Sequence, residues 1–386
     1  MKKIAVITAT RAEYGLLKPV IMSLREYESS GLKIDVVVTG THLSDNYGYT
    51  VNEIEKDDVR IDHKIYSPVN SGSPYDISSN QAEVLLKFTK LFMQEKYNAV
   101  LVLGDRYEIL AIAAAAGNTN TPLFHMCGGD TTEGASDEWI RHSVTKMSYI
   151  HFVTNEDSRR RVIQLGENPD RVFNYGSTSI DNIINTEMFS KKEVLLDIGL
   201  TECCYAICTY HPVTIGSNDV DWMILQFLEA VKKFPDIEFV VTKSNADRGG
   251  ARINLLLDRE EKNIKNLHVF ASLGVKRYLS LVKYSIFVLG NSSSGIIEAP
   301  VFHVPSINIG DRQRGRLQCG SIINCGENVE EIINAIHYVM SGEFRNICLN
   351  AQSPYGTGNA ANKIACKIIE VVNNECIDLK KKFYDL

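Results

Sequence analysis

The sequence predicts an α/β protein made of two Rossmann-like domains that face each other across a cleft. Short apolar, β-rich runs alternate with amphipathic helical stretches along the whole chain. Continuous apolar strands separated by helices are typical of parallel sheets that are covered on both faces. Ten such runs exceed what one doubly wound sheet comfortably contains, so two sheets are expected.

The apolar runs form two groups, one on each side of the polar stretch 182–203. Those before it are 4–8, 35–40, 99–105, 122–127 and 149–155. Those after it are 205–210, 238–244, 266–270, 285–290 and 305–310. We therefore expect an N-terminal domain over 1–182 and a C-terminal domain over 183–365.

Bulk composition argues against several classes of protein. The net charge of −6 disfavours a protein that coats nucleic acid or a membrane surface. The first apolar run is shorter than the roughly 7–15 apolar residues of a secretory signal. The uncharged stretch 109–129 contains Gly117 and Pro122, so it predicts a helix, a turn and a strand rather than a membrane span. A cytoplasmic protein without nucleic-acid or membrane partners is expected.

The cysteines and glycines lack the common cofactor signatures. The nine cysteines show neither Cys-x-x-Cys pairs nor Cys/His ligand spacing, and are expected to be reduced, structural thiols. Neither a GxxxxGK[ST] loop nor a GxGxxG fingerprint occurs, so ATPase and dinucleotide-dependent functions lack their motifs. We expect no metal site and no cofactor.

Polar and charged side chains cluster directly after the predicted strands, where open parallel sheets bind ligands. The main ones are Asp105, Arg106, Asp130, Asp137, His211, Glu298, Arg312 and Arg316. Each has an ordinary explanation by itself, such as a cap, a turn, a surface ion pair or a solvated basic loop. Their shared position at strand ends favours a functional site.

The segment GNSSSG, residues 290–295, is the most informative of these strand ends. Small hydroxyl residues at the start of a helix satisfy backbone N–H groups, and the same geometry receives phosphate. Glu298 lies one helical turn after Ser294, and its carboxylate can accept hydrogen bonds from a ribose diol. Serines near a diphosphate and a glutamate near a ribose predict a site for a nucleoside diphosphate.

Several longer segments resemble one family, the hydrolysing UDP-N-acetylglucosamine 2-epimerases of sialic-acid biosynthesis. They are TATRAEYGLLKP (8–19), VTGTHLSDNYG (38–48), VLGDRYE (102–108), DEWIRHSVTKMS (137–148), HPVT (211–214), SNADRG (244–249), GNSSSGIIEAP (290–300), INIGDRQRGR (307–316) and KKFYD (381–385). The resemblance implies a glycosyltransferase B-type fold. It also implies that the first domain carries the sugar and acid/base groups and the second binds UDP, with a C-terminal helix in 366–386 packing back on the first domain.

The family reaction converts UDP-N-acetylglucosamine and water into N-acetylmannosamine and UDP. It runs by anti elimination of UDP to 2-acetamidoglucal, followed by hydration. The C2 proton has no adjacent carbonyl and is poorly acidic, so the elimination needs a good leaving group and a positioned base. Hydration needs an acid for C2 and a base for water, so at least two acid/base groups should flank the sugar.

The resemblance assigns roles to individual residues. Those expected around UDP are Arg11, Arg106, His211, Asn245, Asp247, Ser292, Ser293, Ser294, Glu298 and Arg312. Arginine and histidine groups would offset the charge of the leaving group, which also gives His211 a catalytic role. Asp105 and Asp137 match the acid/base carboxylates of the family.

One segment departs from the family pattern. Many relatives carry Glu or His directly before a pair of glycines, and this chain has Cys127 there, in the sequence HMCGGD (125–130). Asp130 or Glu138 is expected to take the missing proton-transfer role. The departure leaves open which group is the second acid/base and which sugar substituents are accepted.

Three alternatives remain open at this point. The same chemistry on UDP-N,N'-diacetylbacillosamine, as in legionaminic-acid pathways, would use the same residues. A glycosyltransferase on the same scaffold would need an acceptor site, and a non-catalytic UDP-sugar sensor would leave Asp105 and Asp137 idle. Family behaviour implies a homo-oligomer, a dimer or a tetramer.

Overall fold

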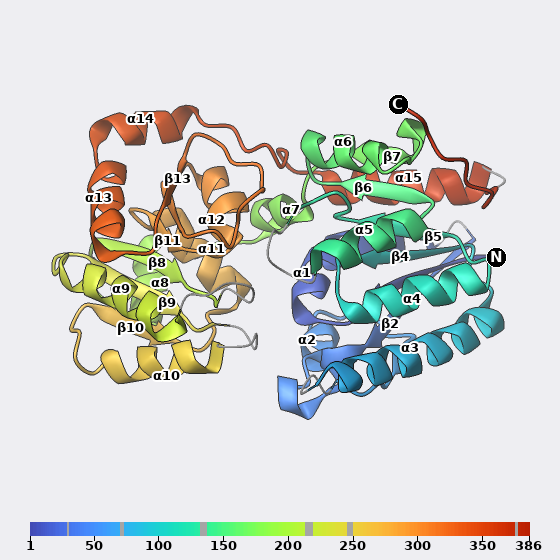
Figure 1. The fold of residues 1–386 in the computed structure, drawn as a ribbon, viewed down its shortest axis with the longest axis horizontal. Helices are drawn as coiled ribbons and strands as arrows, with labels where there is room; N and C mark the ends of the chain where they lie inside the picture. Colours follow the sequence, from blue (N-terminus) through green and yellow to red (C-terminus); the bar gives the residue numbers. More distant parts are fainter. Residues whose placement is uncertain (29–30, 70–72, 132–136, 213–218, 245–249, 375–376) are drawn as a thin grey trace. The chain divides into compact units, whose positions relative to one another are not determined.

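A computed structural model describes residues 1–28, 31–69, 73–131, 137–212, 219–244, 250–374 and 377–386 (Figure 1). The described chain falls into two compact units. The first contains residues 1–131, 137–182 and 355–386, and the second contains residues 183–354.

The first unit is built on a parallel sheet with the strand order β3-β2-β1-β4-β5-β6-β7. Its strands are β1 (Lys2–Thr8), β2 (Leu32–Thr39), β3 (His63–Ile65), β4 (Ala99–Leu103), β5 (Leu123–Met126), β6 (Ile150–Val153) and β7 (Val172–Asn174). Its helices are α1 (Arg11–Arg25), α2 (Val51–Lys56), α3 (Pro74–Glu95), α4 (Tyr107–Asn118), α5 (Asp137–Met147), α6 (Glu156–Gln164) and α15 (Ala360–Asn374). Short 3-10 turns occur at Gly40–Leu43, Asp45–Tyr47 and Pro169–Arg171.

Both faces of this sheet are buried, which explains the continuous apolar runs. Along β1, Ile4 and Val6 belong to a core cluster with residues of α1 and α15, whereas Ala5 and Ile7 belong to another with residues of α3 and α4. Alternate side chains of a strand point to opposite faces, so one apolar strand contributes to two cores. The sheet is therefore a rigid platform for the loops that follow its strands.

The C-terminal helix packs back on the first unit, but not over the expected residues. The helix is α15 (Ala360–Asn374), and residues 377–386 after it form no helix or strand. Ile364 and Ile368 are buried in the core cluster that includes α1. The helix lies earlier in the chain than the expected range of 366–386, because the apolar periodicity begins at Ala360 and ends before the charged C-terminal tail.

The second unit has a parallel sheet with the strand order β10-β9-β8-β11-β12-β13. Its strands are β8 (Tyr205–Thr209), β9 (Glu238–Thr242), β10 (Leu267–Phe270), β11 (Val288–Gly290), β12 (Ser306–Ile309) and β13 (Ile322–Cys325). Its helices are α8 (Lys191–Asp197), α9 (Val220–Lys232), α10 (Gly250–Glu260), α11 (Gly274–Tyr284), α12 (Ser294–Ile297), α13 (Val329–Val339) and α14 (Gly342–Asn350), with a 3-10 turn at Ala299–Phe302. Helix α7 (Thr178–Asn185) contains the border between the units.

The strand order reverses between β1 and β4 in the first sheet, and between β8 and β11 in the second. Loops on either side of such a switch point diverge and leave room for a ligand at the carboxyl ends of the strands. Arg11, Asp105, His211 and Ser292 follow these four strands, whereas Asp130 and Arg312 follow the neighbouring strands β5 and β12. Both sheets have the Rossmann-like arrangement that the sequence predicts.

Candidate active site

Helix α1 begins at the carboxyl end of β1 with a cap that buries a carboxyl group. Thr10 Oγ1 accepts a hydrogen bond from the backbone N of Glu13 at 3.3 Å, and Glu13 Oε2 accepts one from the backbone N of Ala9 at 2.8 Å. Glu13 Oε1 is buried without a hydrogen-bond partner among the described residues. Burial raises the pKa of Glu13 to about 8, so its carboxyl group is protonated at neutral pH.

The loop after β4 places Asp105 against a buried arginine. Nε of Arg141 donates to Oδ2 of Asp105 at 2.9 Å, and Nη2 donates to the same oxygen. The side chain of Arg141 is 3% exposed and that of Asp105 is 27% exposed. Burial alone lowers the pKa of a guanidinium, but Asp105 raises the pKa of Arg141 above its ordinary value. The ion pair therefore fixes one oxygen of Asp105 and leaves the carboxylate at the surface.

Arg141 also binds two further groups of the predicted site. Its Nη1 donates to the backbone O of Asp130 at 2.6 Å and to Oε2 of Glu138 at 2.9 Å. Oε1 of Glu138 lies 3.1 Å from Nε2 of His142. One buried cation thus brings Asp105, Asp130 and Glu138 together, although they come from the ends of β4 and β5 and from α5.

The turn that carries Cys127 is shaped by its glycines. Cys127 has a φ of 64° and Gly129 a φ of 79°, and a Cβ at Gly129 would lie 2.2 Å from the backbone O of Ser158. Oδ1 of Asp130 accepts hydrogen bonds from Thr154 Oγ1 at 2.8 Å and from Ser158 Oγ at 2.6 Å. Hydroxyl groups of the next strand end and of α6 therefore anchor the Asp130 carboxylate.

His125, just before this turn, contacts both the loop after β4 and helix α5. Its Nε2 lies 2.9 Å from the backbone O of Gly104, and its Nδ1 lies 3.3 Å from Thr145 Oγ1. Burial lowers the pKa of His125 to about 3, so the ring is neutral. The neutral ring connects the loop before Asp105 to helix α5.

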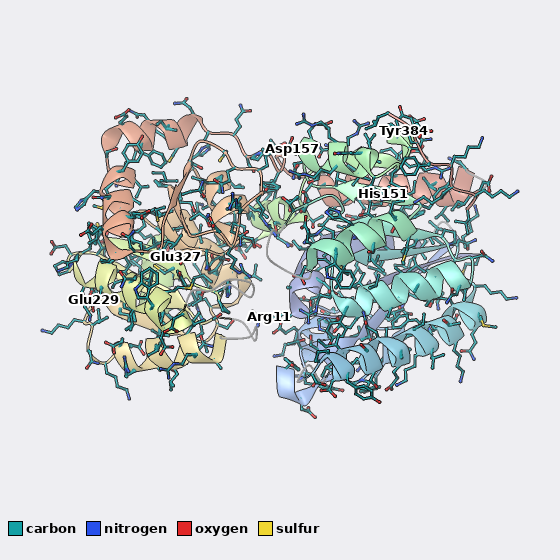
Figure 2. The ribbon with its side chains drawn as sticks, in the orientation of Figure 1. Arg11, His151, Asp157, Glu229, Glu327 and Tyr384 are labelled. Carbon is teal, nitrogen blue, oxygen red and sulfur yellow. The ribbon has the colours of Figure 1, made fainter. Side chains whose placement is uncertain are left out.

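Asp137, Arg106 and Arg11 interact with groups other than Arg141. Asp137 is in the first turn of α5, and its charge is one of those that raise the pKa of Arg106. Arg106 Nε lies 3.5 Å from Oε2 of the buried Glu108. Arg11, labelled in Figure 2, lies at the start of α1, and its Nη1 is 3.6 Å from Oε1 of Glu53. None of these contacts tests the UDP role predicted for the two arginines.

In the second unit, Asn291 connects the ends of β8 and β11. Asn291 Oδ1 accepts from the backbone N of His211 at 2.7 Å, and Asn291 Nδ2 donates to the backbone O of His211 at 2.8 Å. The backbone O of Asn291 accepts from Arg312 Nη1 at 3.1 Å and from Gln313 Nε2 at 2.9 Å. The predicted His211 and Arg312 are thus held by one buried asparagine. Asn245 and Asp247 lie outside the described residues.

The serine segment forms a shorter helix than its sequence suggests. Helix α12 is a single turn, so its dipole is smaller than that of a longer helix. Ser294 Oγ donates to Glu298 Oε2 and accepts from the hydroxyl of Tyr278 at 2.7 Å. Burial raises the pKa of Glu298 above its ordinary value. Ser294 and Glu298 therefore share a face, as their spacing predicts, and are already bonded to each other.

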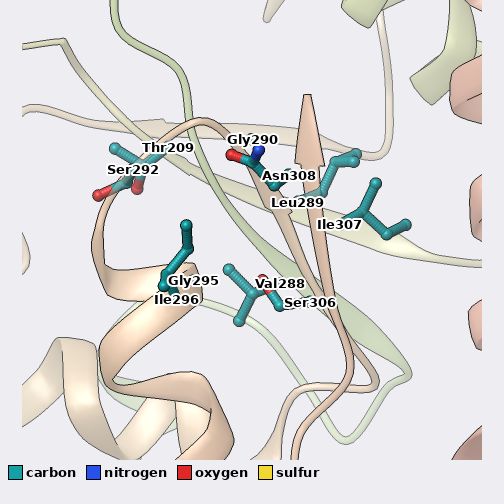
Figure 3. A pocket seen from close by; sticks show the side chains of 10 residues that line it. All are labelled: Thr209, Val288, Leu289, Gly290, Ser292, Gly295, Ile296, Ser306, Ile307 and Asn308. Carbon is teal, nitrogen blue, oxygen red and sulfur yellow. The ribbon is translucent and has the colours of Figure 1, made fainter. Parts of the chain in front are cut away.

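A small pocket lies beside this segment (Figure 3). Its lining comes from the ends of β8, β11 and β12 and from α12, and comprises Thr209, Val288, Leu289, Gly290, Ser292, Gly295, Ile296, Ser306, Ile307 and Asn308. A Cβ at Gly290 would lie 2.1 Å from the backbone O of Thr209, and one at Gly295 would lie 2.6 Å from Ser306 Oγ. The glycines are required because the turn passes close to its neighbours. Oδ1 of Asn308 is buried there without a partner among the described residues.

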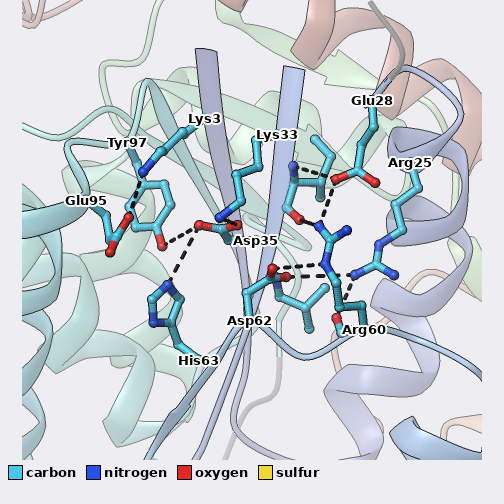
Figure 4. A network of polar contacts seen from close by, with 12 residues as sticks. Lys3, Arg25, Glu28, Lys33, Asp35, Arg60, Asp62, His63, Glu95 and Tyr97 are labelled. Carbon is cyan, nitrogen blue, oxygen red and sulfur yellow. Dashed lines mark hydrogen bonds and ion pairs between the residues drawn. The ribbon is translucent and has the colours of Figure 1, made fainter. Parts of the chain in front are cut away.

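A second charged cluster lies near the amino ends of β1 and β2, away from these loops (Figure 4). Ligand atoms of Asp35, His63 and Glu95 lie within 4.8 Å of one another. However, Lys33 Nζ is 2.7 Å from Asp35 Oδ1, and Lys3 Nζ is 2.7 Å from Glu95 Oε2. Because ammonium groups already neutralise both carboxylates, this cluster is a structural ion network rather than a cation site.

Sequence reasoning missed four residues that organise the site: Glu13, Glu108, Arg141 and Asn291. Each lies inside a segment that resembles the family, but none was singled out. The signal that would have identified them is burial of a polar group, since the structure places all four in the interior. Burial depends on tertiary contacts, which local spacing does not specify.

Solved structures show the class to which this fold belongs. A UDP-GlcNAc 2-epimerase from Neisseria meningitidis, solved bound to UDP-GlcNAc, matches with a TM-score of 0.80 at 22% identity, over 96% of this chain and 100% of that chain. The likeness establishes two parallel-sheet, Rossmann-like domains of the glycosyltransferase B-like class. Within the described residues, no helix combines the length and apolar character needed to cross a membrane.

Sequence comparison gives the family. The family model described as UDP-N-acetylglucosamine 2-epimerase matches residues 25–369, and the chain belongs to this family. The polysialic acid biosynthesis protein P7 of Escherichia coli is 36% identical over 100% of this chain and 98% of its own length. The GDP/UDP-N,N'-diacetylbacillosamine 2-epimerase (hydrolyzing) of Campylobacter jejuni is 37% identical over 100% and 99%. The family resemblance found in the sequence is confirmed.

Proposed function

We propose that the protein hydrolyses UDP-N-acetylglucosamine with inversion at C2, releasing N-acetylmannosamine and UDP for sialic-acid biosynthesis. The observation that carries this proposal is the cluster around Arg141, where Asp105, Glu138 and the carbonyl of Asp130 converge at the carboxyl ends of β4 and β5. Elimination and hydration need several proton-transfer groups in one place. Membership of the family supports the same reaction.

Asp105 is the proposed base that removes the C2 proton. Both hydrogen bonds from Arg141 end on Oδ2, and no hydrogen bond from the described residues reaches Oδ1. Oδ1 can therefore approach a substrate while Arg141 holds the carboxylate in a fixed orientation. Asp137 and Glu138, in the first turn of α5, are the proposed proton-transfer groups for hydration. Asp130 would hold the turn that follows β5 in place.

The second unit supplies the proposed UDP site. Arg312 and His211, held by Asn291, would offset the negative charge that develops on UDP as it leaves. Ser292 and Ser293 would bind the diphosphate. The Oε1 atom of Glu298, which receives no hydrogen bond from the described residues, would accept from the ribose hydroxyls.

A second substrate, UDP-N,N'-diacetylbacillosamine, is favoured by one observation. The Campylobacter jejuni relative that acts on that sugar, by its name, matches the full chain at 37% identity. The substrates differ at C4 and C6 of the sugar. A glycosyltransferase or a UDP-sugar sensor is less well supported, because neither function requires carboxylates gathered for proton transfer.

We also propose that the protein is cytoplasmic and forms a homo-oligomer, either a dimer or a tetramer.

Product analysis in deuterated water tests the proposal. The protein is incubated separately with UDP-N-acetylglucosamine and with UDP-N,N'-diacetylbacillosamine, and the products are identified by NMR. We expect UDP and a free 2-epimerised sugar that carries deuterium at C2, because elimination and hydration exchange the C2 proton with solvent. The faster of the two turnovers identifies the substrate.

The Asp105→Asn variant tests the role of Asp105. It keeps the shape of the side chain and one acceptor oxygen but removes the basic carboxylate. We expect UDP release to fall about 100-fold or more without loss of folding. Product without deuterium at C2 would exclude the elimination, and an unchanged rate in Asp105→Asn would remove Asp105 from the mechanism.

A further inference from the structure

The C-terminal tail, residues 377–386, is bound to the end of helix α5. Nζ of Lys381 donates to the backbone O of Lys146 at 2.9 Å and to the backbone O of Ser148 at 2.7 Å. The backbone N of Tyr384 donates to the backbone O of Gly166 at 3.0 Å. Figure 2 labels Tyr384 on this tail and His151 on the neighbouring strand β6. The tail thus contacts the protein although it has no regular structure of its own.

Lys381 completes the hydrogen bonding of the last turn of α5. The last carbonyl groups of a helix have no partner within the helix. Ser148 donates to two of these carbonyl groups, from its Oγ to Val144 O at 2.8 Å and from its backbone N to Thr145 O at 3.1 Å. Lys381 donates to the following carbonyl group, Lys146 O. A cation at this end of a helix also interacts favourably with the helix dipole.

The ammonium group of Lys381 is held in turn by a buried carboxylate. Glu167 Oε2 lies 2.6 Å from Lys381 Nζ and 3.0 Å from His151 Nε2, and Glu167 Oε1 lies 2.7 Å from Lys146 Nζ. Burial by itself raises the pKa of Glu167, but the hydrogen bonds from His151, Lys146 and Lys381 lower it to about 2. The anchor therefore stays ionised throughout the neutral range.

Phe383 sets the position of the tail along the surface. A Cβ at Gly166, whose φ is 82°, would lie 2.4 Å from the Phe383 ring. Lys146 Nζ lies 5.1 Å from the centroid of the same ring. The ring thus lies directly on a glycine, which leaves Lys381 above the end of α5.

The opposite end of α5 carries the proposed chemistry. Asp137 and Glu138 are in its first turn, and Arg141, one turn later, binds Asp105. A helix of this length behaves as a nearly rigid rod, with a rise of about 1.5 Å per residue. A constraint at its last turn therefore limits sliding and tilting at its first turn.

We propose that Lys381 is a positioning residue of the active site, which acts through helix α5 to keep Asp137, Glu138 and the Asp105–Arg141 pair in place. This inference rests on the proposed function for its effect on catalysis. The tail motif KKFYD then serves the reaction from the far end of the catalytic helix. The tail contacts the helix that carries the proposed proton-transfer groups, so the effect should fall on kcat rather than on KM.

The test compares three full-length variants: Lys381→Met, Lys381→Arg and Lys382→Met. Lys382 is exposed in the same tail. Lys382→Met is the control, because it removes the same charge at the neighbouring position. We expect Lys381→Met to lower kcat about tenfold with KM changed less than about twofold, because small displacements of acid/base groups are costly. Lys381→Arg, which retains the cation and its donors, should recover most of the rate, and Lys382→Met should match the wild type.

Hydrogen exchange of the amides in α5 provides a second readout that needs no substrate. We expect faster exchange over the last turn of α5 in Lys381→Met only, with the rest of the unit unchanged. Normal exchange and normal kcat in that variant would overturn the proposal, and so would an equal loss in Lys382→Met. If the wild type releases no UDP, the proposed function fails, while the exchange measurement still decides whether Lys381 holds the helix.

Discussion

Glu13 shows that the ionisation of a residue can differ from what its sequence motif predicts. In the sequence, Thr10 and Glu13 have the spacing of a helix cap, in which a glutamate is normally ionised. In the structure the carboxyl group is buried, one of its oxygens has no hydrogen-bond partner in the described part of the chain, and its pKa rises to about 8. Glu108 and Asp105 add to the increase, so the carboxyl group lies within the electrostatic reach of the candidate site.

This pKa makes a prediction about stability. The folded protein keeps the Glu13 proton up to about pH 8, whereas the unfolded chain releases it near its ordinary value of 4.5. Between these values the folded state binds more protons, so the free energy of unfolding falls as pH rises, by at most about 1.4 kcal/mol per pH unit. Glu13→Gln should remove this slope in urea titrations from about pH 5 to about pH 8.

The exposed Glu26, at the other end of α1, provides the control. Glu26→Gln should keep the pH dependence of the wild type. Parallel stability curves for the wild type and Glu13→Gln would contradict a raised pKa at Glu13.

At the same scale, the carboxylates of the site were predictable and their partner was not. Asp105, Asp130 and Glu138 follow strands or begin a helix, and that position is visible in the sequence. Arg141 lies in the middle of an amphipathic helix, where an arginine usually faces solvent. Only the fold shows that this arginine is buried and binds all three segments.

At the scale of elements, the interior strands and the edge strand β10 were predicted, whereas the other three edge strands were not. Every predicted run forms a strand, and β3, β7 and β13, which were missed, are outermost in their sheets. Edge strands here are short and partly exposed, with burial that differs from the continuous pattern of β1 or β4. Their sequences therefore lack the apolar run that identifies a strand buried on both faces.

The turn between β5 and α5 allows a sharper prediction. Gly129→Ala places a methyl group at a φ of 79°, 2.2 Å from the backbone O of Ser158. We expect it to lower the free energy of unfolding by about 3 kcal/mol or more, because the strained backbone and the clash add together. Chemical denaturation followed by circular dichroism measures the effect.

Gly117 is the matched control for that substitution. It lies in α4, and a Cβ there would meet no atom within 4 Å. Gly117→Ala should raise the free energy of unfolding by about 0.5–1 kcal/mol through helix propensity. Equal effects of the two substitutions would mean that the turn adapts to a side chain at Gly129.

At the scale of the whole molecule, the chain leaves its first unit and later returns to it. Asp181 is a buried residue at the end of the first passage, and its Oδ1 and Oδ2 accept from the backbone N of Ala360 at 3.1 Å and of Ala361 at 2.9 Å. One carboxylate therefore caps the first turn of α15, the helix that returns. The charge is favourable at a helix N-terminus.

Removal of this cap should weaken the return of the chain. We expect Asp181→Ala to lower the free energy of unfolding by about 1–2 kcal/mol, the usual cost of losing a helix cap. The exposed Asp170 of the same unit gives the control, and Asp170→Ala should have little effect. Thermal unfolding of the two variants makes the comparison, and equal melting temperatures would exclude a capping role for Asp181.

The sequence by itself determined the fold class, the strands of the sheet interiors, the family and the segments that follow each strand. These features depend on local periodicity and on residue order, which a single sequence records. The tertiary structure alone decided that Arg141 joins three acidic segments, that burial raises the pKa of Glu13 and that Lys381 caps helix α5. Those outcomes depend on burial and on contacts between residues far apart in the chain, and burial changes both the pairing and the charge of a side chain.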